Sequence, residues 1–337
     1  MKYIVFGDLH IGLKQSSEAY LDISKRFISD VCDYARENDI YKCTIAGDLF
    51  DNRKNISLSA MNTALSIGSM LQERFQDTYI IIGNHDMMYN DSMDITSVSL
   101  FKEFSNITII DRPRTTDGIQ MLPWLFDKSI LETSDADICI GHFALNGISL
   151  NASGTVAEGF NLNQSDFNKF DTVLSGHFHT PGKYGNIQYM GSPFQTNFND
   201  IGNVTGFYVL DTVTGTVEFI EWNDYPKHIR VKDVDEVNPD VITGSIVELY
   251  FTKDHGIDEN KVIVDKWSDC KPFKLIVKYL NTNTTFTDES IDDDISMKDA
   301  LELLIEYFGK AELTEGLSHN MIDAVIRKLY KEVVDES

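Results

Sequence analysis

Five short apolar segments of this chain end in the same way, with a glycine followed directly by an acidic, amide or imidazole side chain. Apolar runs of this length, separated by helical patterns, predict βαβ units and a largely parallel sheet. The carboxyl ends of such strands converge on one crevice, so the polar side chains that follow them are expected to meet there. The segments are Gly7-Asp8-Leu9-His10, Gly47-Asp48-Leu49-Phe50-Asp51, Gly83-Asn84-His85-Asp86, Gly141-His142 and Gly176-His177-Phe178-His179.

The first two thirds of the chain, residues 1–225, carry this pattern and are predicted to form one domain. Helical spacing of apolar residues begins at Tyr20, and Ser57 is placed to cap a second helix that runs towards Phe75. The last strands lie close together, which predicts hairpins on the far side of the fold. The predicted strands are 3–6, 44–46, 79–82, 107–110, 138–140, 172–174, 188–190, 207–210 and 217–222.

The pattern changes after residue 225. Residues 226–280 predict a compact α+β capping domain, with strands at 246–251 and 274–279 around a helix at 258–265. Residues 281–296 hold five acids and no lysine or arginine, which is typical of a flexible acidic linker. Residues 297–337 then predict a pair of helices, each with one apolar stripe.

Charge and cysteine usage narrow the class of protein. The formal charge of −24, from 29 basic and 53 acidic residues, argues against a generic nucleic-acid coat, because such binding rests on basic side chains. It does not exclude a nuclease, since bound divalent ions supply positive charge at the phosphate. The four scattered cysteines and the short apolar runs predict a reduced cytoplasmic protein without a membrane span.

The side chains that follow the strands have a specific ligand chemistry. Five of the eight histidines lie in the five segments, and each preceding glycine lets the backbone approach a site without a Cβ in the way. One such histidine alone is a weak signal, but packing does not account for the whole set. Carboxylate, imidazole and amide groups without a thiolate suit Mn²⁺, Fe or Zn at a hydrolytic site. Two ions about 3.5–4 Å apart are the standard device for attack on phosphorus.

These motifs resemble the calcineurin-like metallophosphoesterase superfamily. Their order and spacing look like its double-strand-break repair nucleases, which include the nuclease component of the bacterial SbcCD complex and the recombination endonuclease of T-even phages. The resemblance covers about residues 1–222 and is only architectural beyond 230. It implies an α/β fold, with a β-sandwich flanked by helices, an α+β capping domain and a C-terminal helical pair. Further landmarks are Leu122-Pro123-Trp124, Tyr189-Met190-Gly191-Ser192-Pro193 and Gly206-Phe207-Tyr208-Val209-Leu210-Asp211.

The resemblance also implies a ligand set for two divalent ions, with Mn²⁺ favoured and Mg²⁺ left open. One ion would be held by Asp8, His10 and His179. The other would be held by Asn84, His142 and His177, and Asp48 would bridge the two ions.

Four residues beside the ligands are given other roles by the resemblance. His85 would contact the scissile phosphate or protonate the leaving oxygen, which suits a group that titrates near neutral pH. Asp86 either orients His85 or caps its loop. Asp51 stands where many cellular relatives have histidine, which removes a possible phosphate contact. Arg53 either meets the DNA backbone or belongs to a solvated loop.

The implied function is a DNA nuclease subunit, exonuclease or endonuclease, of a double-strand-break processing complex. Its partners would be DNA and a coiled-coil ABC-type ATPase bound through residues 297–335, in a heterotetramer built on a homodimer. Two alternatives remain. A phosphomonoesterase or cyclic phosphodiesterase would share the metal site but needs no tail of this kind. A scaffold without catalysis would not need every ligand position filled, as it is here.

Overall fold

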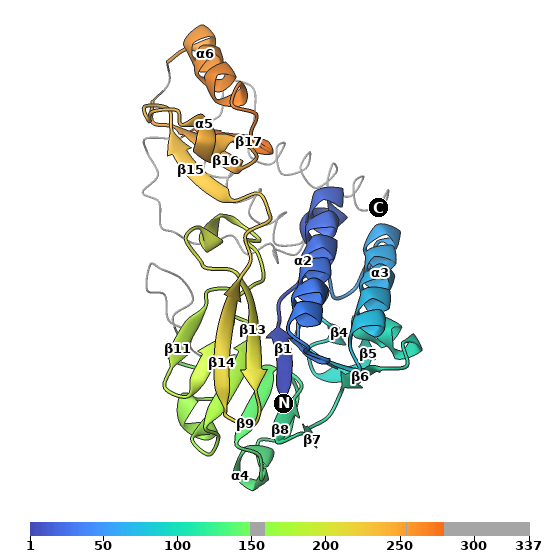
Figure 1. Cartoon of the computed structure of the whole chain (residues 1–337). Helices are drawn as coiled ribbons and strands as arrows, with labels where there is room; N and C mark the ends of the chain where they lie inside the picture. Colours follow the sequence, from blue (N-terminus) through green and yellow to red (C-terminus); the bar gives the residue numbers. More distant parts are fainter. Residues whose placement is uncertain (149–158, 254, 280–337) are drawn as a thin grey trace, which may run out of the picture. The chain divides into compact units, whose positions relative to one another are not determined.

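The computed structural model describes residues 1–148, 159–253 and 255–279, and Figure 1 shows their arrangement. Two six-stranded sheets carry most of the strands, and a three-stranded sheet and a two-stranded hairpin complete the described part. Residues Met1–Leu280 form one compact unit. The predicted acidic linker, 281–296, and helical pair, 297–337, lie outside the described residues. Among the helices that are described, none is long and apolar enough to cross a membrane.

The first sheet has the strand order β14-β13-β1-β2-β3-β6. Strands β1, β2, β3 and β6 are parallel, whereas β13 runs antiparallel to β1 and pairs with β14 in a hairpin. The hairpin that the sequence predicts for the last strands is present: β13 and β14 extend the first sheet beside β1 and form one of its edges. The strands are β1 (Lys2–Phe6), β2 (Lys42–Ala46), β3 (Asp77–Ile81), β6 (Ile107–Ile110), β13 (Gly206–Asp211) and β14 (Thr216–Glu221).

The second sheet has the order β11-β12-β10-β9-β8-β7. Its four central strands, β12, β10, β9 and β8, are parallel, and the two edge strands are antiparallel. The expectation of largely parallel strands therefore holds for four adjacent strands in each of the two six-stranded sheets. The strands are β7 (Arg114–Thr116), β8 (Ile119–Leu122), β9 (Ile138–His142), β10 (Thr172–Gly176), β11 (Gly182–Tyr184) and β12 (Ile187–Tyr189).

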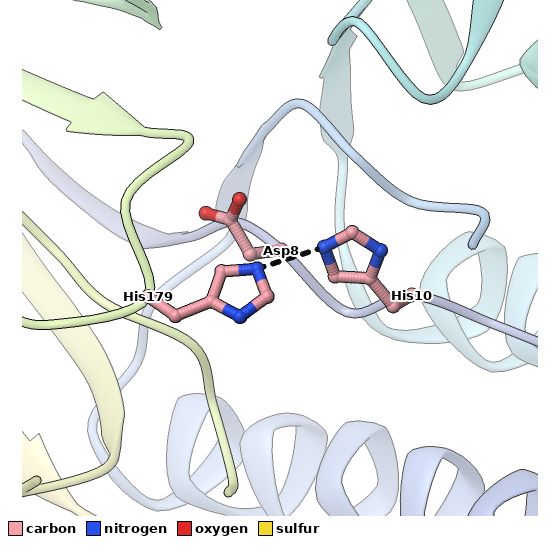
Figure 2. A group of neighbouring side chains, drawn as sticks. All are labelled: Asp8, His10 and His179. Atoms are coloured by element: carbon pink, nitrogen blue, oxygen red, sulfur yellow. Dashed lines mark hydrogen bonds between the residues drawn. The ribbon is translucent and has the colours of Figure 1, made fainter. Parts of the chain in front are cut away.

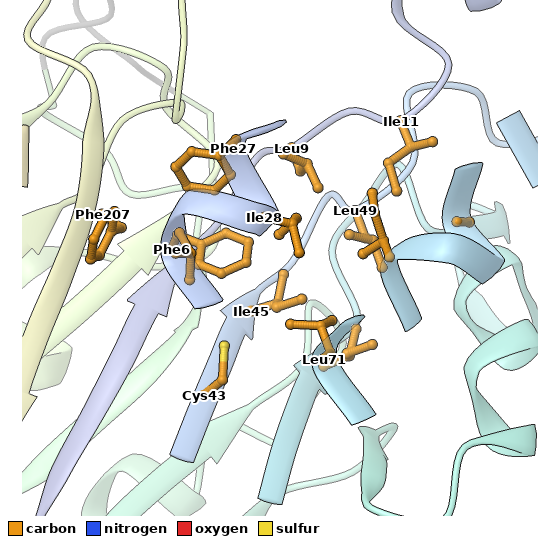
Figure 3. Close-up of a cluster of buried hydrophobic side chains, with 14 of the residues drawn as sticks. Phe6, Leu9, Ile11, Phe27, Ile28, Cys43, Ile45, Leu49, Leu71 and Phe207 are labelled. Carbon is orange, nitrogen blue, oxygen red and sulfur yellow. The ribbon is translucent and has the colours of Figure 1, made fainter. Parts of the chain in front are cut away.

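Each sheet is buried on both faces, which is why its central strands have almost no polar positions. In β1, Tyr3 and Val5 pack against the second sheet. Ile4 and Phe6 point to the opposite face, where they join the cluster under the helices. Figure 3 shows that cluster, in which Phe6 meets Phe27 edge-on with ring centroids 5.2 Å apart. Alternate side chains of β1 therefore pack into the core between the two sheets and into the core under the helices.

Two long helices, α2 (Glu18–Glu37) and α3 (Leu58–Arg74), supply that helical layer and lie side by side in Figure 1. Helix α3 begins where the sequence predicts, because the Ser57 side chain accepts a hydrogen bond of 3.1 Å from the backbone amide of Ala60. The remaining short helices are α1 (Leu13–Ser16), α4 (Ile130–Thr133), η1 (Ser97–Glu103), η2 (Gln164–Phe167) and η3 (Phe198–Asp200). The predicted sandwich flanked by helices is confirmed.

The capping region has its own parallel sheet, in the order β15-β16-β17. Its core gathers around the buried ring of Trp267. The sequence identified β16 and β17 but not β15, a short strand whose residues alternate between half-buried and exposed. The elements are β15 (His228–Lys232), α5 (Pro239–Ile242), β16 (Ile246–Phe251), α6 (Ile257–Ser268) and β17 (Lys274–Tyr279).

Candidate metal centre

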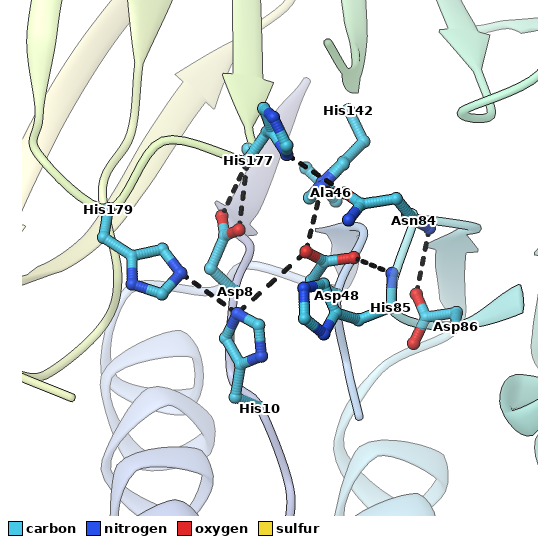
Figure 4. Close-up of polar contacts among 12 residues, drawn as sticks. Asp8, His10, Ala46, Asp48, Asn84, His85, Asp86, His142, His177 and His179 are labelled. Atoms are coloured by element: carbon cyan, nitrogen blue, oxygen red, sulfur yellow. Dashed lines mark hydrogen bonds and ion pairs between the residues drawn. The ribbon is translucent and has the colours of Figure 1, made fainter. Parts of the chain in front are cut away.

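The polar residues of all five segments meet where the carboxyl ends of the two sheets face each other (Figure 4). From the first sheet, Asp8 follows β1, Asp48 follows β2 and Asn84 follows β3. From the second sheet, His142 ends β9 and His177 follows β10. In the described residues, two groups have the composition and closeness needed to hold a metal ion.

The first group consists of Asp8, His10 and His179 (Figure 2). The Nε2 atoms of the two imidazoles face each other at 3.0 Å. The carboxylate of Asp8 is fully buried and accepts hydrogen bonds of 3.0 and 3.1 Å from the backbone amide of His177. These contacts hold the ligands of the first group against a residue of the second.

The second group consists of Asp48, His142 and His177. The amide oxygen of Asn84 lies 3.0 Å from His142 Nε2 and 3.0 Å from His177 Nδ1, so it joins this group. Asp48 Oδ2 is 3.1 Å from His142 Nε2 and 4.0 Å from His10 Nε2 of the first group. Asp48 is therefore the carboxylate that lies between the two groups.

Contacts on the outer side of two of the rings, His142 and His179, place Nε2 of each towards the centre. His142 Nδ1 donates to the carbonyl oxygen of Ala46 at 2.8 Å, and His179 Nδ1 lies 3.3 Å from the hydroxyl of Thr196. In a neutral ring with the proton on Nδ1, Nε2 would present its lone pair to a cation bound at the centre. Partners of this kind fix the tautomer and ring orientation of metal-binding histidines. The donor set is thus already oriented for cations.

Electrostatics also favour positive charge at this place. Burial raises the pKa of Asp8. Burial acts in the same direction on Asp48, but the charge and hydrogen bond of His142 hold the pKa of Asp48 well below its ordinary value. Burial lowers the pKa of a histidine, yet Asp48 and Asp8 raise the pKa of His142 to about 9. Two buried carboxylates that stabilise a positively charged imidazole would equally stabilise divalent cations.

The backbone at these ligands is strained. Asp8, His10, Asp48 and His177 all have φ in the left-handed region, at 54°, 48°, 49° and 90°. Each such non-glycine conformation costs about 1–2 kcal/mol, and strain of this kind concentrates at functional sites. Gly83 shows why glycine precedes a ligand, because a Cβ there would lie 2.2 Å from Asp48 Oδ1. The strand ends are therefore shaped for close approach of ligands rather than for local stability.

His85 lies beside the two groups rather than within them. Its backbone amide donates a 2.8 Å hydrogen bond to Asp48 Oδ1, and its ring meets that of His10 edge-on at 5.1 Å. Its Nδ1 lies 2.8 Å from the carbonyl oxygen of Asp51. With the proton on Nδ1, Nε2 is the nitrogen left to act on a bound substrate.

The three residues given supporting roles, Asp86, Asp51 and Arg53, have different surroundings in the structure. Asp86 is fully buried, and its oxygens accept from the backbone amides of Phe50 and Gly83 at 3.1 and 2.9 Å. Burial and the nearby Asp48 raise the pKa of Asp86 to about 7. These contacts match the loop-capping alternative, whereas it is the Asp51 carbonyl that meets the His85 ring.

Asp51 and Arg53 lie in the loop between β2 and α3. The carboxylate of Asp51 is 3.5 Å from His10 Nδ1, on the side of the ring that faces away from His179. It therefore lies against one of the candidate ligands. The guanidinium of Arg53 donates to Asn90, in the turn between strands β4 (Met87–Tyr89) and β5 (Ser92–Thr96).

Sequence reasoning missed several residues that complete the centre. Trp124 packs beside both ligand histidines of the second group, with ring centroids 5.8 Å from His142 and 5.0 Å from His177. The Leu-Pro-Trp landmark was the available signal for it. Thr196 lies behind His179, and its position carries no local pattern that separates it from other loop threonines.

The arrangement defines a class of protein. Two groups of nitrogen and oxygen side chains that could hold metal ions lie on either side of one carboxylate, and an imidazole stands next to them, which matches the layout of a two-metal phosphoesterase. The comparison with known families agrees, because the calcineurin-like phosphoesterase family matches residues 1–181. The chain belongs to the calcineurin-like phosphoesterases, metal-dependent hydrolases of phosphate esters.

Two curated relatives have names that specify the nuclease branch. Exonuclease subunit 1 of enterobacteria phage T4 is 34% identical over 243 residues, which cover 68% of this chain and 70% of that protein. An SbcCD nuclease subunit from Staphylococcus epidermidis is 22% identical over 246 residues, or 63% of this chain and 66% of that protein. The chain thus spans about two thirds of each relative's length.

Solved structures give a weaker likeness. An archaeal phosphodiesterase matches with a TM-score of 0.35 and 12% identity, covering 66% of this chain and all of that protein. A nuclease named MPE from Pseudomonas putida matches with a TM-score of 0.30 and 15% identity, covering 55% of this chain and 66% of that protein. Similarities at this level carry no argument about function.

Proposed function

We propose that this chain is the Mn²⁺-dependent DNA nuclease subunit of a double-strand-break processing complex. The observation that carries the proposal is the position of Asp48, which lies between two ligand groups at the carboxyl ends of both sheets. A carboxylate in this position could contact both ions, which favours two neighbouring ions over two ions at separate sites. Divalent ions bound there would supply positive charge at a phosphate and lower the pKa of a water molecule.

The chain's own residues have separate tasks in this reaction. Asp8 and Asp48 hold their carboxylates at the centre, where backbone amides of His177 and His85 keep them in place. In its imidazolium form, His85 keeps one proton on Nδ1 against the Asp51 carbonyl and can pass the second, on Nε2, to the oxygen that leaves the phosphorus. Trp124 packs against His177 and covers one side of its ring.

The choice of metal follows from the donor set. Each group contains only carboxylate and imidazole ligands, with the Asn84 amide oxygen added to one of them. Three of the cysteines are buried and the fourth, Cys270, is half-buried in the capping region. Oxygen and nitrogen ligands without thiolate suit Mn²⁺, and Mg²⁺ is the second candidate.

The choice of DNA rests on the relatives. The phage relative is named an exonuclease subunit and the staphylococcal relative a nuclease subunit. Both names also describe parts of a larger assembly, so we propose a partner, a coiled-coil ABC-type ATPase that binds residues 297–335. Those residues lie outside the described part of the chain. A basic partner would also help to hold DNA against a subunit whose formal charge is −24.

A comparison of three substrates tests the proposed reaction. With Mn²⁺, we expect cleavage of bis-p-nitrophenyl phosphate and of linear duplex DNA, and little release of phosphate from a nucleotide monophosphate. The matched control is the same protein treated with a chelator, which should cleave none of them. Turnover of the monophosphate alone would identify a phosphomonoesterase instead, and no turnover of any substrate would favour a scaffold.

Truncation after Asn281 tests the partner. We expect the shortened protein to keep Mn²⁺-dependent cleavage of short DNA, because every residue of the metal centre precedes residue 200. Capture of the ATPase and ATP-stimulated duplex processing should both be lost, since the short helices predicted for residues 297–335 would need a groove to cover their apolar stripes. Full capture of the ATPase by the truncated protein would place the partner's docking site elsewhere.

A further inference from the structure

We propose that Asp200, acting through the hydroxyl of Thr196, is the positioning residue for the ligand His179. The proposal rests on the metal site of the proposed function and adds to it the part of the chain that holds one ligand in place. The two residues lie in the loop between β12 and β13, directly after the Gly191-Ser192-Pro193 landmark, to which the sequence assigns no role.

The three side chains form a linear relay. His179 Nδ1 lies 3.3 Å from Thr196 Oγ1, and Thr196 Oγ1 donates to Asp200 Oδ2 at 2.7 Å. Asp200 Oδ2 also accepts from the backbone amides of Thr196 and Asn197, at 2.8 and 3.2 Å. Thr196 is 2% exposed and Asp200 is 3% exposed, so water does not compete for these bonds.

The chemistry of the three side chains determines which of them donates and which accepts in each hydrogen bond. A hydroxyl has a single proton, and here the carboxylate of Asp200 takes it. The oxygen of Thr196 is then left to accept, so the proton of His179 stays on Nδ1 and Nε2 keeps its lone pair. Nε2 is the atom that faces His10 across 3.0 Å. The pair thus selects the tautomer of His179 that can bind a cation.

The same loop holds His179 through its backbone. The amide of Ser192 donates to the His179 carbonyl at 3.3 Å. Asp200 also closes a capping box with Asn197 at the start of η3, so the same carboxylate stabilises the turn that follows Thr196. His179 is therefore fixed at both its main chain and its ring by one short segment.

The capping region anchors this segment from the other side. Gln195 Oε1 accepts from the backbone amide of His228, at the start of β15, at 2.8 Å. The ring of Phe198 meets the His228 ring edge-on at 4.8 Å, and the Arg230 guanidinium lies 5.7 Å from the Phe198 centroid. The loop is held between a metal ligand and the first strand of the capping region, so both determine where His179 sits.

Mn²⁺ titration calorimetry, with electron paramagnetic resonance of the loaded protein, tests the proposal without any substrate. Thr196→Val should weaken one of two Mn²⁺ sites by about 10–100-fold, the range typical of lost outer contacts to a metal ligand. The other site should be unchanged, and the spin-coupled signal of a Mn²⁺ pair should be lost at limiting metal. Thr196→Ser keeps the hydroxyl and should restore both the affinity and the signal.

Asp200→Asn provides a second measurement, because the neutral amide oxygen is a weaker acceptor for the hydroxyl. We expect a smaller loss at the same site. The matched control is Asp166→Asn, which breaks the same kind of capping box at η2, where Asp166 also pairs with Lys128. That control should bind both ions as the wild type does.

Wild-type affinity at both sites in Asp200→Asn, or in a folded Thr196→Val protein, would overturn the positioning role. Equal weakening in Asp166→Asn would overturn it as well, because the effect would then be general destabilisation. Failure of the wild-type protein to bind a pair of ions would contradict the proposed function itself. The two hypotheses therefore fail in different measurements.

Discussion

Replacing Asp48 by asparagine should reduce Mn²⁺-dependent cleavage of bis-p-nitrophenyl phosphate by about 10³-fold or more. Bound metal ions contribute several kcal/mol to such reactions, and each 1.4 kcal/mol is about tenfold in rate. Asp48 lies 3.1 Å from a ligand of one group and 4.0 Å from a ligand of the other, so the change affects both ions at once. Metal content per chain and the cleavage rate, measured on the same preparation, check this result.

The control for this variant is Asp117→Asn. Asp117 pairs with Lys42 at 2.6 Å, at the opposite end of β2 from Asp48, and both substitutions remove one carboxylate charge. We expect the control to keep its metal and its activity. Wild-type cleavage by Asp48→Asn, or loss of one ion with full retention of the other, would contradict the shared role of this carboxylate.

His85→Gln should retain both metal ions and lose about 10²–10⁴-fold in kcat, the usual contribution of a general acid or base. The hydrogen bond from residue 85 to Asp48 comes from the backbone amide, so the substitution leaves it in place. His177→Gln is the contrasting variant, because His177 belongs to a ligand group. It should lose metal together with activity.

A comparison of two substrates with different leaving groups tests the role of His85 more specifically. If His85 protonates the leaving oxygen, the loss should be large with DNA, whose leaving alkoxide needs a proton. It should be much smaller with bis-p-nitrophenyl phosphate, whose leaving phenolate is stable. An equal loss with both substrates would favour a phosphate contact instead, and a loss of metal from His85→Gln would make it a ligand.

Much of the fold was predictable because its central strands are buried on both faces. Residues 3–6 and 79–82 are continuous apolar runs. A run of this length is typical of a strand that is covered on both faces. Strand β8 (Ile119–Leu122) is equally buried, but its Gln120 interrupts the run, and the sequence did not indicate it. Gln120 is satisfied by Thr115 and Ser134, contacts that exist only after the strand has paired.

In the capping region, too, a strand was missing from the elements that the sequence predicted. Strand β15 (His228–Lys232) alternates half-buried Ile229 and Val231 with exposed Arg230 and Lys232, but this alternation was too short to be identified as a strand by itself. Its place beside β16 depends on parallel pairing with a strand that comes later in the chain, beyond α5. Pairing of this kind is determined by packing, which local propensity does not describe.

The seven ligand-type residues were visible in the chain because they lie in segments that follow a glycine at the end of an apolar strand, and the geometry of parallel strands brings such ends together. The structure places all seven at one centre. Which nitrogen of each histidine faces that centre was not visible. For His142 the partner is the Ala46 carbonyl, and for His179 it is the Thr196 hydroxyl, both from other segments of the chain. A motif at the end of a strand consists of neighbouring residues, so it can be recognised in the sequence. The residues that orient its side chains come from other segments, and only the tertiary structure brings them together.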